Sequence, residues 1–365
     1  MSALAHLTVV EIGDDSGGYA GKLLVDLGAR VVRVIIEPET MVGFAIDPDP
    51  YVQDFLHRSK ETLALPADPR EAVRLFEELV AGADILLESG PPDLLERIGV
   101  SAGAVSRPSL IRTRISPFGL DGEHALDPAS DLTVSASSGF LSLGGWPDRA
   151  PTRAFGDQSW RMASLHAAVA TLLAVIEEDT SGLGQQVDVS AQEAVATALE
   201  NALQFYDLEG VVRTRIGAGY NEAGTGVYTC ADGYVYLMVG RLSTAQGWAN
   251  LLTWFDDVGL AGRDVLRDAV WSDHAYRQEP SAQAYFRELF ERFAAGRDKS
   301  DLYVEAQQRG IAMSPINSLD DLLSSEQLNA RNFFLKKNGS KLVGAPYRLS
   351  LTPWEMKPAP AQVTS

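Results

Sequence analysis

The stretch LTVVEIGDDSGGYAGKLLVDLGARVVRVII, residues 7–36, decides the fold. Its first segment, 7–12, is a short apolar run that ends at Gly13, which is typical of a buried strand. Residues 17–28 follow with a helical pattern that closes on a glycine, and 29–36 is a second apolar run. Strand, glycine-rich turn, helix and strand in this order predict a βαβ unit with parallel strands.

The same alternation continues beyond this unit. In 69–82 the apolar residues fall on one helical face, and the short segments ADILLES at 83–89 and SLIRTRIS at 109–116 predict two more strands. The clearest helical pattern covers 159–182, where we expect His166 to be packed in the core with the apolar residues of its face. That face comprises Met162, Leu165, His166, Val169, Leu172, Leu173 and Ile176. The first part of the chain, 1–215, is therefore predicted to be a large α/β domain on a mostly parallel, Rossmann-like sheet.

The first strand–helix turn also invites comparison with dinucleotide-binding domains, because Glu37 lies about where such domains place an acidic residue. The glycines do not fit that motif. Gly13, Gly17, Gly18 and Gly21 do not make the G-x-G-x-x-G spacing that binds a pyrophosphate. We therefore expect no nicotinamide cofactor.

The composition changes after the large domain. Residues 211–226 are glycine-rich and polar, and 227–240 reads as a hairpin with an Asp-Gly turn. We predict a smaller α+β domain at 216–320, followed by a C-terminal segment, 321–365, that returns to the large domain.

Composition and charge exclude several classes of function. The 365 residues have a formal net charge of −18, and they contain no cluster of Lys and Arg of the kind that phosphate backbones attract. Cys230 is the single cysteine and the five histidines are scattered, so we expect neither a disulfide nor a metal site. No run approaches about 18 apolar residues and no signal-peptide pattern is present, so we expect no membrane partner and a cytoplasmic protein.

Seven strings in a fixed order carry a resemblance to a known family. They are KLLVDLGARVVRV (22–34), AGADILLESGPPDLLERIGV (81–100), ISPFGLDG (115–122), ASDLTVSASSG (129–139), GLGQQVDVS (182–190), ADGYVYLMVG (231–240) and GIAMSPINSLDDLLSSEQLNARNFF (310–334). In order and spacing they resemble the class III CoA-transferases, the group of formyl-CoA transferase, carnitine-CoA transferase and the bile-acid-inducible proteins. The resemblance runs from the first strand to the proline-rich tail.

This resemblance implies a homodimer of two chains threaded through one another like linked rings. It implies acyl-CoA and a carboxylic acid as substrates, with an aspartate that attacks the thioester and later carries CoA as an aspartyl-CoA thioester. A carboxylate nucleophile divides one difficult exchange into easier steps. The family's glycine-rich flap, which supplies hydrogen-bond donors to the oxyanion, corresponds to NEAGTG at 221–226 and so to Gly224 and Gly226.

The resemblance also implies cations that hold the phosphates of CoA. Arg97, in DLLERIG, matches the family's arginine in the equivalent string, although it could simply pair with Glu96 or Asp93 on the surface. Arg58 and Lys60 stand, in shifted positions, where the family has an Asn-Lys-Arg-Ser string. Arg33 falls on the cation at the end of the second strand, where a structural role is equally open.

The position of the nucleophile is ambiguous in this sequence. Counting back without gaps from GLGQ at 182–185 puts Trp160 at the family's aspartate position, where it could cover an acyl chain or stack on adenine. A slip of three residues would instead place Asp157 there, since AFGD at 154–157 resembles the Ala-Leu-Gly-Asp of some transferases. Asp157 could equally be a helix N-cap, and Asp131 could cap the next helix or touch the CoA tail.

Three hypotheses therefore stand. The first is a CoA-transferase that uses Asp157 or a displaced carboxylate. The second is another reaction on acyl-CoA, such as isomerisation, racemisation or dehydration; racemisation by the family's His–Asp pair is disfavoured because Ser130 precedes Asp131 where that pair has its histidine. The third is a CoA-binding homologue that lacks the nucleophile, either alone or as the partner of an active chain.

Overall fold

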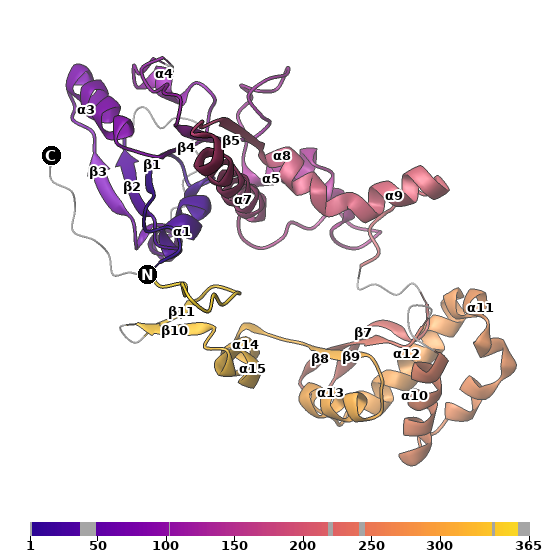
Figure 1. The fold of residues 1–365 in the computed structure, drawn as a ribbon. Helices are drawn as coiled ribbons and strands as arrows, with labels where there is room; N and C mark the ends of the chain where they lie inside the picture. The colour runs from indigo at the N-terminus through magenta and orange to yellow at the C-terminus, as the bar shows by residue number, and fades with distance from the viewer. Residues whose placement is uncertain are drawn as a thin grey trace. The chain divides into compact units, whose positions relative to one another are not determined.

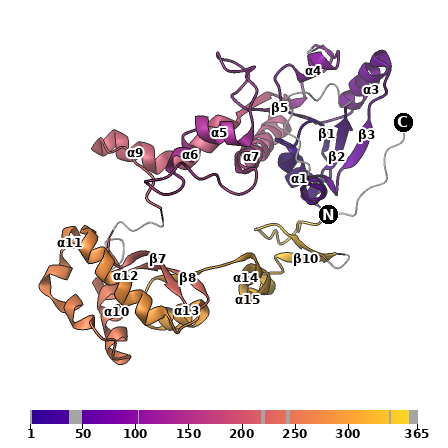
Figure 2. The ribbon, with the colours of Figure 1, turned by 180° about the vertical axis from the view of Figure 1, so that it is seen from behind.

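The computed structural model describes residues 2–36, 49–101, 103–217, 222–240, 245–337 and 340–356. The chain forms two compact units, which Figure 1 and Figure 2 show from opposite sides. Unit 1 comprises Met1–Leu143, Arg153–Arg213 and Gly344–Ser365, and unit 2 comprises Gly144–Thr152 and Thr214–Val343. The domain boundaries that the sequence suggests, at 215 and 320, remain a prediction; the second compact unit continues to Val343.

Unit 1 is built on a six-stranded sheet in the order β3-β2-β1-β4-β5-β6, with every neighbouring pair parallel. Its strands are β1 (Thr8–Gly13), β2 (Arg30–Ile35), β3 (Glu61–Ala64), β4 (Ile85–Ser89), β5 (Ile111–Ser116) and β6 (Gln186–Ser190). Its helices are α1 (Gly18–Asp26), α2 (Pro50–His57), α3 (Pro69–Ala81), α4 (Leu94–Arg97), α5 (Asp131–Ser137), α6 (Phe140–Leu143), α7 (Gln158–Ser181), α8 (Ala191–Ala196) and α9 (Glu200–Glu209), with a 3₁₀ turn at Thr197–Leu199. The predicted mostly parallel α/β sheet is confirmed.

Helices cover both faces of this sheet, as Figure 1 shows. One core joins α1 and α7 to side chains such as Val9, Val31 and Ile85. The other joins α3 and α4 to the opposite face of the same strands, with Phe76 at its centre. The sheet order reverses direction between β1 and β4, because β1 leads through β2 to β3 on one side and β4 leads to β5 and β6 on the other. In open α/β sheets, ligands bind outside the carboxyl ends of the strands at such a reversal.

Helix α7 departs from the prediction in the face that it buries. Its buried residues are mostly small: Ser159, Trp160, Ala163, Ser164, Ala167, Ala168, Thr171, Ala174 and Val175. The prediction that His166 is packed in the core is wrong for this chain, since His166 is exposed on the opposite side together with the larger apolar residues. The small residues let α7 approach α1 and β5 closely, so that Thr171 hydrogen-bonds Thr113 of β5 at 2.7 Å.

By length and composition, α7 is also apolar enough to cross a membrane. Half of its most apolar window is buried inside unit 1, as in the core helix of a soluble protein, so the helix is weak evidence for a membrane span.

Unit 2 contains a three-stranded antiparallel sheet, β7-β8-β9, and a separate hairpin. Its strands are β7 (Thr225–Cys230), β8 (Gly233–Met238), β9 (Met313–Ile316), β10 (Phe334–Lys337) and β11 (Ser340–Val343). Its helices are α10 (Ala245–Asp257), α11 (His274–Gln278), α12 (Pro280–Ala294), α13 (Lys299–Gln308), α14 (Leu319–Ser324) and α15 (Glu326–Ala330), with 3₁₀ turns at Arg263–Arg267 and Ala269–Ser272. The predicted hairpin is present, and an aromatic core that includes Trp254, Trp271 and Phe286 lies beneath it.

Candidate active site

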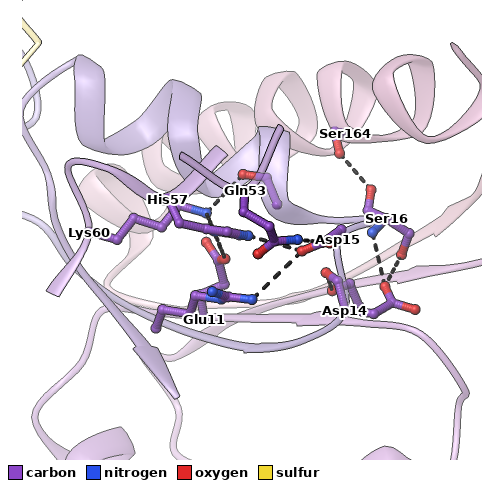
Figure 3. Close-up of polar contacts among 11 residues, drawn as sticks. Glu11, Asp14, Asp15, Ser16, Gln53, His57, Lys60 and Ser164 are labelled. Carbon is purple, nitrogen blue, oxygen red and sulfur yellow. Dashed lines mark hydrogen bonds and ion pairs between the residues drawn. The ribbon is translucent and has the colours of Figure 1, made fainter. Parts of the chain in front are cut away.

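The loop Asp14–Ser16 lies at the carboxyl end of β1, where the sheet order reverses. Hydrogen bonds with several elements hold this loop in place. The backbone N–H of Asp14 donates to the carbonyl of Ser89 at the end of β4, and the Ser89 hydroxyl donates back to the Asp14 carbonyl at 2.7 Å. From α7, the Ser164 hydroxyl donates to the Ser16 carbonyl at 2.7 Å, as Figure 3 shows. The loop is therefore held in one conformation by β4 and α7 together.

A small cavity of about 70 Å³ opens between this loop and the segment that follows β4. Its lining includes Asp14, Ser16, Pro91, Arg97, Asp127 and Trp160. Trp160 has only 5 % of its surface exposed, so its ring forms part of the wall and of the adjoining core. The cavity has room for a few non-hydrogen atoms, such as a thioester group, but not for a whole ligand.

Asp14 is one of the lining residues, and its carboxylate is held in one orientation by Ser16. Its side chain is 6 % exposed, and its Oδ1 accepts hydrogen bonds from the backbone N–H of Ser16 at 3.0 Å and from the Ser16 hydroxyl. Figure 3 shows the carboxylate turned toward Ser16. Asp14 carries no signal in the sequence, because an Asp in a turn after a strand is an ordinary turn residue.

Within this loop, Asp15 belongs to a buried network of charges that Figure 3 displays. His57 Nε2 lies 2.9 Å from Asp15 Oδ1, and His57 Nδ1 lies 3.1 Å from Lys60 Nζ. Burial and the Lys60 ammonium lower the pKa of His57 to about 4. A neutral ring that donates from Nε2 and accepts at Nδ1 satisfies both contacts.

Lys60 is enclosed within this network. Its Nζ donates to Glu11 Oε1 at 2.6 Å, to the Gly18 carbonyl at 2.8 Å and to His57. Burial lowers the pKa of Lys60 to about 8, although the nearby Glu11 carboxylate opposes this shift. Since an ammonium group has three donors, this geometry favours a structural role over the predicted contact with a CoA phosphate.

Two other predicted CoA contacts, Arg33 and Arg58, also pair within unit 1. The Arg33 guanidinium lies 3.7 Å from Asp15, and Arg58 Nε donates to Asp54 Oδ1 at 2.8 Å. Neither residue lines the small cavity or the larger one described next.

Arg97 lines both cavities. The second has a volume of about 730 Å³ and lies between α3, α4 and the segments after β2 and β3. Its lining combines apolar side chains such as Leu65 and Val73 with the guanidinium groups of Arg70, Arg74 and Arg97. The expectation that Arg97 pairs with Asp93 is also met, at 2.9 Å, with the side chain about one-third exposed. The sequence analysis did not single out Arg70 or Arg74, because charged residues on an amphipathic helix usually only face water.

At the start of α7 the structure separates the roles of two predicted residues. Asp157 occupies the N-cap position but its side chain makes no capping hydrogen bond; it pairs with Arg153 at 3.0 Å instead. The cap comes from Asp131, which is buried and whose Oδ1 accepts from the backbone N–H of Ser159 at 2.7 Å. Asp131 thus satisfies an orphan N–H in the first turn of α7. Asp157 does not line the small cavity.

In unit 2, Gly224 and Gly226 lie where the chain enters and forms β7, and both have positive φ. A Cβ on Gly224 would come within 3.0 Å of Trp248 and Val239, so the turn needs glycine there. Asn221, the first residue of NEAGTG, lies outside the described residues. Within the described part of the chain, no group of three or more His, Cys, Asp or Glu is arranged to hold a metal ion.

The chain matches the model of CoA-transferase family III over residues 4–363. It is 35 % identical to the succinyl-CoA:(R)-benzylsuccinate CoA-transferase subunit BbsE of Thauera aromatica, over 96 % of this chain and 89 % of that one. It is 26 % identical to the succinyl-CoA–L-malate CoA-transferase alpha subunit of Chloroflexus aurantiacus, over 96 % of this chain and 83 % of the relative. A CAIB/BAIF family protein from Brucella suis has the same fold, with a TM-score of 0.85 and 24 % identity over 99 % of this chain and 96 % of the other.

The chain therefore belongs to CoA-transferase family III, which confirms the resemblance found in the sequence. As an enzyme of this family it transfers CoA between an acyl-CoA and a carboxylic acid.

Proposed function

We propose that the protein takes CoA from succinyl-CoA and passes it to a second carboxylic acid through an aspartyl-CoA intermediate. The observation that carries the choice of donor is the 35 % identity over nearly the whole chain to a subunit of a succinyl-CoA-dependent transferase. Two further relatives, at about a quarter identity, are also succinyl-CoA or succinate transferases. The acceptor is left at the level of its class, a carboxylate.

The larger cavity is the proposed site for the nucleotide end of CoA. The phosphates of CoA carry several negative charges, and the lining of this cavity includes Arg70 and Arg74 of α3 and Arg97 of α4. The apolar lining around Leu65 and Val73 suits the adenine ring. Arg97 also lines the small cavity, the proposed place of the thioester, and so is shared by the two proposed parts of the CoA site.

The glycine-rich flap and the assembly of chains belong to the same proposal. Gly224 and Gly226 would let backbone N–H groups approach the oxyanion of each tetrahedral intermediate. We propose that two chains combine as the interlocked homodimer that the sequence predicts, in the cytoplasm. The support is an exposed apolar strip on α7, formed by Leu165, Val169, Leu173 and Ile176, whose side chains are each at least half exposed in the single chain.

Exchange of label between succinate and succinyl-CoA tests this function without knowledge of the acceptor. The protein is mixed with succinyl-CoA and labelled succinate, and incorporation of label into succinyl-CoA is followed with time. We expect the unmodified protein to exchange label. In Arg97→Ala and Arg70→Ala we expect a raised KM for succinyl-CoA, because each variant loses a cation that binds CoA. Arg292→Ala, an exposed arginine of unit 2, is the control. If calorimetry shows that the protein binds succinyl-CoA but no label is exchanged, the proposal is contradicted.

One observation favours a second role. Two relatives are named as subunits of enzymes, and the count without gaps from GLGQ puts Trp160 at the family's aspartate position. A chain without a nucleophile would bind CoA and support an active partner of the same family. In that case the protein alone binds succinyl-CoA but exchanges no label, and exchange appears only when the second chain is added.

A further inference from the structure

We propose that the hydrogen bond between the buried Glu222 carboxylate and His274 holds the glycine-rich flap in the position that CoA transfer requires. This inference rests on the proposed function and adds two positioning residues to it, which act through the flap rather than on the substrate. It follows from the way in which the described part of the flap, 222–226, is attached to unit 2.

Glu222 turns its side chain into unit 2. The residue is 5 % exposed, and a Cβ atom on Gly240 would lie 2.1 Å from Glu222 Oε1 and 2.4 Å from the hydroxyl oxygen of Thr225. Two side chains of the flap therefore pack directly against the backbone that follows β8. A buried carboxylate is costly unless donors or cations surround it, so the groups that face Glu222 influence the position of the flap.

Helix α11 supplies those groups. Nδ1 of His274, the first residue of α11, lies 3.2 Å from Glu222 Oε2. Since a carboxylate ion only accepts hydrogen bonds, the N–H at Nδ1 of His274 is the donor. Arg277, three residues later, is buried in the same region: burial lowers the pKa of its guanidinium, and the Glu222 carboxylate opposes that shift. One helix thus brings a donor and a cation to the carboxylate of the flap.

The backbone of the flap is held by the same two neighbours, α11 and the end of β8. The N–H of Ala223 donates to the carbonyl of Arg277 at 2.8 Å, and the N–H of Val239 donates to the carbonyl of Gly224 at 2.8 Å. The described part of the flap is therefore a turn with a defined position in unit 2. Donors that stabilise an oxyanion need such a fixed geometry, because a group that must reorganise during the reaction loses much of its effect.

His274 can be replaced without opening the core of unit 2, since its side chain is about half exposed. Arg277 is less suitable, because its guanidinium carbon lies 3.8 Å from the centre of the Trp248 ring and its Nε donates to the carbonyl of Trp271. His274→Ala removes the donor to Glu222. His274→Asn keeps a donor, because the amide nitrogen of asparagine can stand close to the place of Nδ1 on the imidazole ring.

The first test is the exchange of label between succinate and succinyl-CoA. We expect His274→Ala to lower kcat by about a hundredfold, as a misplacement of about 1 Å can do, and to leave the KM for succinyl-CoA unchanged. His274→Asn should recover most of kcat. His6→Ala, at an exposed histidine of unit 1, is the control and should match the unmodified protein. Equal loss of kcat in His274→Ala and His274→Asn, or a raised KM in place of a lowered kcat, would show that the flap does not depend on this donor.

Hydrogen–deuterium exchange, read by mass spectrometry, follows the flap itself and needs no turnover. In His274→Ala we expect the amides of the peptide that covers 222–226 to exchange faster than in the unmodified protein and in His274→Asn, while peptides from α12 keep their rates. Unchanged exchange at 222–226, or faster exchange throughout unit 2, overturns the assignment. If the unmodified protein transfers no label, the proposed function fails, and the exchange rates at 222–226 still decide whether His274 holds the flap.

Discussion

A Cβ atom on Gly21 would lie 1.6 Å from Oε2 of Glu11 and 3.0 Å from Nζ of Lys60. Because Gly21 has no side chain, α1 can pack closely over the buried ion pair of Glu11 and Lys60. We expect Gly21→Ala to lower the free energy of unfolding by about 2–3 kcal/mol, because the methyl group must displace a buried ion pair. Chemical denaturation measures the change. Gly103→Ala has nothing within 4 Å of the added methyl and serves as the control; an equal loss in both variants would contradict this explanation.

His57 gives unit 1 a dependence on pH. Its pKa is about 4 in the folded protein against 6.5 in the unfolded chain, so between these values the unfolded chain binds more protons. Stability should therefore fall by about 3 kcal/mol as the pH drops from 6.5 to 4, and this contribution is fully present above pH 6.5.

Denaturation at a series of pH values checks this expectation, with His57→Gln beside the unmodified protein. The glutamine keeps a polar side chain but does not titrate, so the slope between pH 4 and 6.5 should become shallower. The same slope in both proteins would assign the pH dependence to other groups.

At the scale of single residues the sequence predicted types of chemistry better than positions. Arg97 was predicted as a CoA contact because it lies in a string that resembles the family, and it lines both cavities. Asp14, Arg70 and Arg74 were not predicted, because only the folded chain brings a turn residue to one cavity and two helix arginines to another. Lys60 was predicted as a CoA contact because nothing in HRSK shows that Glu11, forty-nine residues earlier, lies beside it.

Among the elements, the first turn of α7 depends on Asp131 of α5. Asp131→Ala removes the buried acceptor of the Ser159 N–H, and we expect a loss of about 1–2 kcal/mol of stability, the usual value of a helix cap. Asp157→Ala removes only a partly exposed ion pair with Arg153, and its effect should be below about 1 kcal/mol. Urea denaturation of the two variants ranks them, and a larger loss in Asp157→Ala would reverse the assignment of the cap.

Helical periodicity predicted the existence and length of α7 but not the face that unit 1 buries. Periodicity identifies the most apolar face of a helix, whereas α7 packs its alanines, serines and threonine against α1 and the sheet. Such small residues permit a close approach that larger ones would prevent. By contrast, β1 and β4 were predicted nearly to the residue, because strands buried on both faces are nearly continuous apolar runs bounded by glycine or polar turns.

Over the whole molecule, the order of local elements was enough to predict the parallel sheet, since a strand–helix–strand connection forces parallel neighbours. The strand β3 was missed because ETLA is short and half-buried at the edge of the sheet. The order of the strands could not be read from local patterns, and it is this order that places the Asp14 loop beside the end of β4.

The apolar strip on α7 is the surface on which the proposed homodimer can be tested. Leu165, Val169, Leu173 and Ile176 recur along one side of α7 and remain exposed in the single chain. Leu173→Glu places a charge in the middle of this strip, and burial of an unpaired carboxylate opposes association. We expect this variant to shift the protein toward a smaller species in sedimentation velocity at a concentration where the unmodified protein is associated. Val304→Glu makes the same change at an exposed valine of α13 in unit 2, and it should leave the sedimentation unchanged. Equal sedimentation of the unmodified protein and the Leu173 variant would mean that the strip is not an interface between chains.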